Sequence, residues 1–188
     1  RRYQMQNVWR ADRPQHGRFQ EFLQCDADVV GERSLWQEVE GVLLYDLVFS
    51  QLQLQGVKVH LNHRKILAGL ASYIGAESQL IDFTVALDKL GKIGQQGVID
   101  ILKTKGFSQN AIDRLKVFLD LEGDFESQLS LVAEALKEMK VAQEGIAELE
   151  FIYNQLKRRS LDAISICFDL TLARGLNYYT GAILEVAP

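Results

Sequence analysis

The feature that most restricts the fold is a change of hydrophobic period along the chain. At both ends, apolar and polar residues alternate with the period of two that is typical of β-strands. From Arg64 to Arg159 the apolar residues recur with a helical period instead. This order predicts an α+β fold in which an all-helical subdomain, residues 64–159, is inserted between two sheet-forming parts, residues 1–63 and 160–188.

The first end of the chain predicts a β-hairpin. Two alternating runs, Tyr3 to Asp12 and Phe19 to Val30, predict strands, and the basic link from Arg13 to Arg18 predicts the turn between them. A turn centred in the middle of this link would pair the strands antiparallel. Arg10 would then lie opposite Phe22.

Because side chains alternate across a strand, this hairpin has two different faces. One face is apolar and is expected to face the core. The other combines a guanidinium, an aromatic ring, amides and carboxylates, which suit a small zwitterion bound beside a nucleotide. Polar faces of two-stranded ribbons are more often simply solvated, and the pattern alone leaves that interpretation open. The apolar face has Leu23, Cys25, Ala27 and Val29; the polar face has Gln4, Gln6, Val8, Arg10, Asp12, Gln20, Phe22, Gln24, Asp26 and Asp28.

Two motifs resemble one family. The stretch from Arg10 to Asp28, with RPQ-x-GR followed by F-x-Q-x-D-x-D, resembles motif 2 of class II aminoacyl-tRNA synthetases in its histidyl-tRNA synthetase form. The stretch from Leu172 to Val186, LARGLNYYTGAILEV, resembles the histidine-specific signature of the same family. The resemblance implies part of the class II antiparallel sheet with a packed helix, interrupted by the helical insertion.

The resemblance implies an enzyme that activates histidine with ATP to histidyl-adenylate and then transfers the histidyl group to tRNA(His), in the cytoplasm, with Mg²⁺ accompanying ATP. Such a reaction needs positioning and charge neutralisation and no enzyme nucleophile. Arg10 would hold the α-phosphate and the histidine carboxylate, and Arg174 would reach the α-phosphate from the other side. We therefore expect Arg10 and Arg174 to converge on one anion. The further implied roles are ATP binding by Arg18 and by Phe22, which would stack on adenine, and histidine binding by Gln24, Asp28, Arg174, Tyr178 and Tyr179.

The match also has departures. Gln20 stands where the family often has a second arginine, and Asn177 stands where aspartate is common. Motif 1, motif 3 and an anticodon-binding domain are not found. We therefore expect a longer parent enzyme that forms a homodimer, and we expect this chain alone to be inactive or nearly so and monomeric or associated in a non-native way.

A different class of protein is the alternative. The synthetase-like regulatory subunit of ATP phosphoribosyltransferase shares the fold and senses histidine without charging tRNA. The complete RGL-x-YYTG pattern that begins at Arg174 argues against it. A purely structural helical module would leave both motifs unexplained.

The remaining elements follow from periodicity. Ser34 to Gln55 predicts a helix, Val57 to Asn62 a strand, and Leu161 to Leu172 a central strand. His60 and His63 are expected to be exposed polar residues without chemistry. The helices predicted in the insertion are Arg64–Ile74, Gln79–Leu90, Gln95–Lys105, Ser108–Leu121, Phe125–Leu136 and Ala142–Arg158, with Ser78, Ser108 and Asp124 as N-caps, and a last strand is predicted over Ala182–Val186.

Composition limits the partners. The net charge of −4 gives no general basic surface, so contact with RNA must be local; the resemblance implies that some lysines of the insertion meet the tRNA. Cys25 and Cys167 lack paired spacing and predict reduced thiols of a cytosolic protein, and no metal site is expected. No apolar run is long enough for a membrane span.

Overall fold

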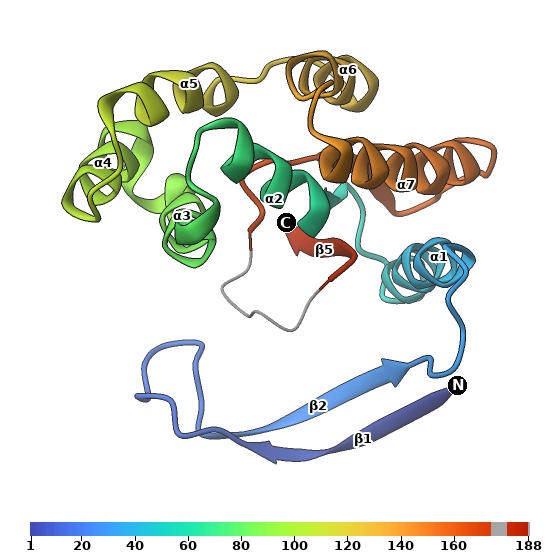
Figure 1. The fold of residues 1–188 in the computed structure, drawn as a ribbon. Helices are drawn as coiled ribbons and strands as arrows, with labels where there is room; N and C mark the ends of the chain where they lie inside the picture. Colours follow the sequence, from blue (N-terminus) through green and yellow to red (C-terminus); the bar gives the residue numbers. More distant parts are fainter. Residues whose placement is uncertain (174–179, 188) are drawn as a thin grey trace. The chain divides into compact units, whose positions relative to one another are not determined.

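The computed structural model describes residues 1–173 and 180–187, which form two compact units, Arg1–Gln37 and the chain from Glu38 onward. The fold is α+β, as predicted, with a β-hairpin in the first unit and a small sheet with several helices in the second (Figure 1). The predicted division into residues 1–63, 64–159 and 160–188 stays a prediction.

The first unit is built on the antiparallel hairpin of β1 (Arg2–Trp9) and β2 (Glu21–Asp28). Its apolar face is exposed, with Tyr3 80% and Leu23 65% accessible to solvent. Within the first unit, the prediction that Leu23 and its neighbours face a core is therefore wrong. The physical reason is that a two-stranded ribbon has no second layer of its own to cover it.

The second unit contains a mixed sheet with the order β4-β3-β5. In its centre, β3 (Val57–His63) pairs in parallel with β4 (Ile164–Phe168) and antiparallel with β5 (Ala182–Ala187). The segment predicted as a central strand, Leu161–Leu172, therefore lies at an edge of the described sheet. It is also shorter than predicted, because the chain leaves the strand at a turn that begins at Asp169.

The chain between β3 and β4 is mostly helical. α2 (Arg64–Tyr73) begins directly after β3, and α7 (Lys140–Lys157) is the last helix before β4. No helix of residues 1–173 and 180–187 combines the length and apolar character needed to cross a membrane. The other helices are α1 (Trp36–Gln51), which precedes β3, and η1 (Glu77–Gln79), α3 (Leu80–Leu87), α4 (Leu90–Thr104), α5 (Gln109–Leu119) and α6 (Phe125–Ala135) within the insertion.

Two of these helices begin at side-chain caps that the sequence predicts. Ser108 at α5 and Asp124 at α6 each accept a hydrogen bond from the backbone N–H three residues on, at 3.2 and 2.8 Å, which confirms both predicted caps. The predicted cap Ser78 is wrong, because this residue lies inside η1. α4 begins earlier than the predicted Gln95 and bends at Gly94, whose φ of 68° is not helical.

The core of the second unit lies where α2 and α7 pack on each other and on β3. Figure 1 shows α2 and α7 side by side. The two helices approach so closely that Gly69 of α2 faces Ala142 of α7 with no room for a Cβ atom. Each large apolar side chain buried here contributes roughly 1.5–3 kcal/mol. The fully buried set includes Val59, Leu61, Ile66, Leu67, Leu70, Leu149 and Ile152.

Candidate functional site

The polar face of the hairpin has the predicted residues in a different register. Val8 pairs with Phe22, and the backbone N–H of Arg10 donates to the carbonyl of Gln20 at 2.8 Å. The prediction that Arg10 lies opposite Phe22 is therefore wrong by two residues. Because the shift is even, each of these side chains stays on its predicted face.

The observed register differs from the predicted one because more residues lie on one side of the turn than on the other. Gln15 and Arg18 close a tight turn through backbone hydrogen bonds of 2.9 and 3.1 Å. Between this turn and the paired strands, the first side runs through Ala11–Pro14, whereas the second side passes only through Phe19. A prediction that assumed equal lengths on both sides could not find this asymmetry.

Three predicted site residues meet on this face. The guanidinium carbon of Arg10 lies 5.1 Å from the centre of the Phe22 ring, and Arg10 Nη2 donates to Gln24 Oε1 at 3.4 Å. Gln24 Nε2 in turn donates to Asp26 Oδ1 at 2.6 Å. A cation on an aromatic face with an amide beside it offers an anion site next to a stacking surface. The arrangement fits a phosphate and a planar base held side by side.

Two other predicted residues lie elsewhere on the hairpin. Asp28 accepts hydrogen bonds of 2.6 and 3.0 Å from Nη2 and Nε of Arg2, its cross-strand neighbour. The exposed side chain of Arg18 belongs to the turn. Sequence reasoning missed the Arg2 partner, although Arg2 falls on the same alternating face as Arg10.

The histidine-specific signature is only partly described. Arg174, Tyr178 and Tyr179, together with Asn177, lie outside the described residues. The expected convergence of Arg10 and Arg174 therefore stays a prediction. The chain is described up to Ala173 and again from Thr180.

Both histidines of β3 have carboxylate partners that the sequence did not reveal. His60 Nδ1 lies 3.0 Å from Asp169 Oδ2, and His63 Nε2 lies 2.7 Å from Glu148 Oε2. The prediction that these histidines are exposed and have no acidic partner is wrong, since the His63 side chain is fully buried and that of His60 is mostly buried. The carboxylates come from distant parts of the sequence, so no local spacing reports them.

The surroundings of His63 favour its neutral form. Its Nδ1 accepts a hydrogen bond from the backbone N–H of Lys65 at 3.1 Å, which caps α2, so the ring proton is assigned to Nε2 and points at Glu148. Burial lowers the pKa of His63 below its ordinary value of 6.5, although the Glu148 carboxylate acts in the opposite direction. Lys65 Nζ binds Glu148 at 2.6 Å and Glu144 at 3.2 Å, and these bonds raise the pKa of the lysine. The cluster ties α2 and α7 to the end of β3.

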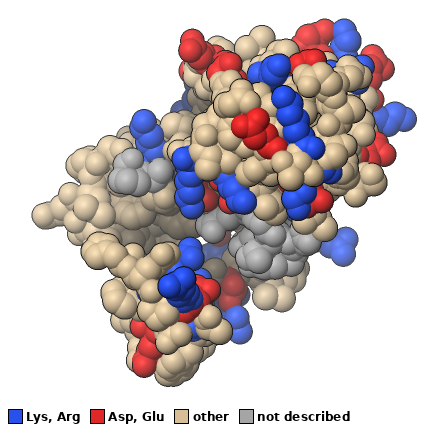
Figure 2. All heavy atoms as spheres, turned by 90° about the vertical axis from the view of Figure 1, so that its left-hand side faces the viewer, with Lys and Arg blue, Asp and Glu red and all other residues tan. Residues whose placement is uncertain are grey.

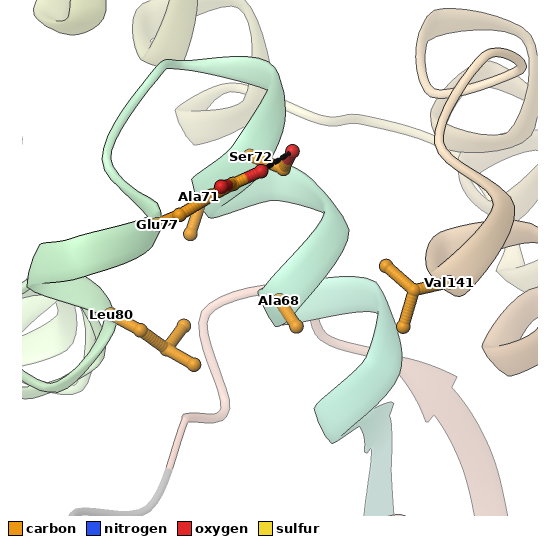
Figure 3. A pocket seen from close by; sticks show the side chains of 6 residues that line it. All are labelled: Ala68, Ala71, Ser72, Glu77, Leu80 and Val141. Carbon is orange, nitrogen blue, oxygen red and sulfur yellow. Dashed lines mark hydrogen bonds between the residues drawn. The ribbon is translucent and has the colours of Figure 1, made fainter.

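Two pockets in the second unit differ in the side chains that line them. One, of about 240 Å³, is mostly apolar, and its carboxylate, Glu77, accepts a hydrogen bond from Ser72 (Figure 3). Another, of about 200 Å³, is lined by Lys157, Arg159 and Tyr153 among others. Lys157 is paired with Glu126 at 2.8 Å, and the tyrosine ring stacks on Phe125. The first pocket is lined by Ala68, Ala71, Ser72, Glu77, Leu80 and Val141.

Metal ligands do not gather in the described residues, where no group of three or more His, Cys, Asp and Glu side chains is placed to hold an ion. Cys25 and Cys167 are free thiols. The insertion has a mixed surface: Figure 2 shows basic and acidic side chains interleaved, and pairs such as Lys105–Asp82 and Lys116–Asp113, at 2.8 and 2.9 Å, account for some of them. No subset of lysines is thereby marked out for tRNA, so that expectation stays a prediction.

Comparison with known proteins gives one consistent family. The chain is 54% identical to histidine–tRNA ligase of Christiangramia forsetii over 187 residues and 52% identical to that of Flavobacterium johnsoniae. It is fully covered in both matches but spans only 41% and 39% of these relatives.

Solved structures agree with this result. Histidyl-tRNA synthetase from Nostoc sp. PCC 7120 superposes with a TM-score of 0.85 at 28% identity, over 98% of this chain and 43% of that one. A Bacillus halodurans protein described as an ATP phosphoribosyltransferase regulatory subunit/histidyl-tRNA synthetase superposes with a TM-score of 0.79 over 97% of this chain and 46% of that one; at 22% identity it shows the shared fold alone. Since the histidyl-tRNA synthetase family model matches residues 1–186, this chain belongs to the histidyl-tRNA synthetase family.

Proposed function

We propose that the protein containing this chain is a histidine–tRNA ligase, which joins histidine to ATP and then transfers the histidyl group to tRNA(His). The names of the curated relatives support this activity. The structural observation that supports it most directly is the Arg10 guanidinium held 5.1 Å from the Phe22 ring with Gln24 beside it. Because the chain spans about two fifths of these relatives, the activity is proposed for the longer protein.

The proposed chemistry relies on positioning. In the first step a histidine carboxylate oxygen attacks the α-phosphorus of ATP, and pyrophosphate leaves. Arg10 neutralises the charge on the α-phosphate and the carboxylate, and Phe22 supports the adenine. In the second step a hydroxyl of the terminal adenosine of the tRNA attacks the activated carbonyl, and AMP leaves.

Other groups have supporting roles in this proposal. Gln24 and Asp28 orient the amine and imidazole of histidine; Asp28 would do so while neutralised by Arg2. Arg18 reaches the distal phosphates or the tRNA end. Magnesium enters with ATP as part of the substrate. From the second motif, Arg174 supplies charge at the α-phosphate, and Tyr178 and Tyr179 line the histidine pocket, with Tyr179 bonding the imidazole.

The wider assignments are also part of the proposal. The parent is a class II enzyme that works as a homodimer in the cytoplasm. The non-catalytic alternative, a histidine-sensing regulatory subunit, is less supported, because the most similar curated relatives reported above are ligases and the regulatory description occurs on a neighbour of only 22% identity.

Pyrophosphate exchange on the full-length protein tests the proposal. Exchange should depend on histidine and should not occur with other amino acids, and the purified enzyme should charge tRNA(His). Arg10→Ala should slow exchange by roughly 100- to 1,000-fold, the usual effect of losing one charge-stabilising donor. Arg33→Ala, which removes an arginine outside the polar face, is the matched control. Histidine binding without exchange would favour the regulatory alternative, and a normal rate in Arg10→Ala would contradict the role of this residue.

A further inference from the structure

The segment that contains the histidine-specific signature is held on both sides by the end of β3. Residues 174–179 are not described, but the residues that precede and follow them are. The preceding flank makes hydrogen bonds to Asn62 and Arg64, and the following flank makes one to Arg64. These two residues are separated by a single residue at the junction of β3 and α2. Residues 62–64 thus fix the positions at which the chain leaves the sheet before residues 174–179 and returns to it after them.

Asn62 holds the flank that leads into the signature. Its Nδ2 donates to the carbonyl of Leu170 at 3.0 Å and to that of Leu172 at 2.9 Å. The residue is completely buried, and its Oδ1 has no hydrogen-bond partner in the structure, so the two donor bonds set the orientation of the amide. An amide is well suited here, since one uncharged nitrogen supplies two N–H groups.

Arg64 holds both flanks at once. Its Nη1 donates to the carbonyl of Ala173 at 2.7 Å, at the last described position before Arg174. Its backbone N–H donates to the carbonyl of Gly181 at 3.0 Å, just after it. Beyond Gly181, Ala182 pairs with His63 at the start of β5. Arg64 therefore binds the chain both before and after residues 174–179.

The entry flank is fixed further upstream by Asp169. Its backbone N–H donates to the carbonyl of Leu61 at 2.9 Å, and its Oδ1 accepts bonds from the N–H and the hydroxyl of Thr171 at 2.9 and 2.6 Å. Its Oδ2 lies 3.0 Å from His60 Nδ1. The turn after β4 is thus attached to β3 residue by residue, and the burial of Leu170 and Leu172 in the core supports the same path.

We infer that Asn62 and Arg64 are positioning residues for histidine recognition: their hydrogen bonds hold the chain on both sides of residues 174–179, which include Arg174, Tyr178 and Tyr179. This inference rests on the proposed function, because it assumes that the signature binds histidine. Neither residue needs to touch the substrate. Loss of either side chain releases the entry end at Leu170–Ala173, whereas the backbone N–H of residue 64 still holds Gly181. A shift of about 1 Å in residues that position a substrate can slow a reaction by up to about 100-fold.

The test uses full-length enzyme with Asn62→Ala, Arg64→Met and Arg64→Lys. Steady-state pyrophosphate exchange gives kcat and KM separately for histidine and for ATP. Asn62→Ala and Arg64→Met should raise the KM for histidine by roughly 10- to 100-fold and lower kcat, while the KM for ATP stays close to wild type. Arg64→Lys keeps a donor and should restore part of the histidine affinity.

Gln143→Ala is a matched control. Gln143 Nε2 also bridges two backbone carbonyls, those of Ala133 and Leu136, at 3.0 and 3.1 Å, but within the insertion. This variant should lower the melting temperature without changing the KM for histidine. An equal rise in that KM would show that general loss of stability explains the effect, and would overturn the inference.

The remaining outcomes are separable. Wild-type histidine KM in folded Asn62→Ala and Arg64→Met would overturn the positioning role while leaving the proposed function intact. If Asn62→Ala does not fold, the half-buried Arg64 still decides, through its Met and Lys variants. A wild-type enzyme without histidine-dependent exchange would reject the proposed function and, with it, this inference.

Discussion

Asp46 of α1 provides a direct test of how the sheet is joined to the helix that precedes it. Its carboxylate is buried and accepts hydrogen bonds from three successive backbone N–H groups at the start of β4. Oδ1 accepts all three, from Asp162 at 3.0 Å, Ala163 at 2.8 Å and Ile164 at 3.2 Å, whereas Oδ2 reaches only Asp162, at 3.2 Å. Oδ1 therefore accepts most of the hydrogen bonds that join Asp46 to β4.

This asymmetry predicts different costs for two substitutions. Asp46→Ala removes every acceptor and leaves the buried N–H groups of Ala163 and Ile164 without a partner, at about 1.5–3 kcal/mol each, so the free energy of unfolding should fall by about 3–6 kcal/mol. Asp46→Asn can place its carbonyl oxygen where Oδ1 lies and keep all three bonds. It should lose only the charge and one long bond, about 1–2 kcal/mol.

Hydrogen exchange measured by mass spectrometry on peptides covering residues 160–168 locates the effect, and thermal denaturation of the same proteins gives its size. Asp46→Ala should lower protection in these peptides by two or more orders of magnitude, at about 1.4 kcal/mol per tenfold change. Equal losses in the Ala and Asn variants would refute the assignment of the bonds to Oδ1. Unchanged exchange in Asp46→Ala would refute the anchor itself.

Three further predictions follow from packing, titration and the hairpin. Gly145→Ala should lower stability by about 1–3 kcal/mol in a thermal melt, because its Cβ would lie 3.0 Å from His63 Nδ1, whereas Gly91→Ala has open space and should not. Folding lowers the pKa of His63, so the buried neutral ring contributes fully to the free energy of unfolding above about pH 6.5. This contribution should be lost as the pH falls through the pKa of His63 in the folded protein, by at most about 1.4 kcal/mol per pH unit. His63→Gln should remove this slope in denaturation curves between pH 7 and 5; Glu148, whose pKa is lowered from 4.5, contributes only at more acid pH. Phe22→Leu should raise the KM for ATP about tenfold with little change for histidine, and the reverse pattern in pyrophosphate exchange would contradict a stacking role.

Local pattern was sufficient to predict the strands and the α-helices, although not the short 3-10 helix η1. Strict alternation in Val57–Asn62 predicted β3, because a strand with one face on the core needs apolar residues at every second position. The strand runs one residue further than predicted. The caps Ser108 and Asp124 were predictable because a cap satisfies N–H groups only a few residues away. Such interactions are local, and their signal is local too.

The sequence predicted which face of the hairpin carries the candidate site residues, but it did not predict which residues pair across the two strands. Alternation alone assigns Arg10, Phe22 and Gln24 to one side of the hairpin, and they meet there. The pairing depends on the extra residues Ala11–Pro14 on one side of the turn, which no alternation reports. An even shift preserved the face; an odd one would have inverted it.

The end of β3 shows where sequence reasoning stops for a physical reason. Asn62, His63 and Arg64 are consecutive, yet they bind the turn after β4, helix α7 and the two flanks of the signature, respectively. Each partner lies about a hundred residues away, so what these side chains do is set by the topology that brings β4, β5 and α7 to this point. Their polar character, read locally, predicts solvent exposure, and only the fold turns it into buried attachment. A polar residue at the end of a central strand, where other segments converge, therefore needs a structural partner assigned before it is taken to be solvated.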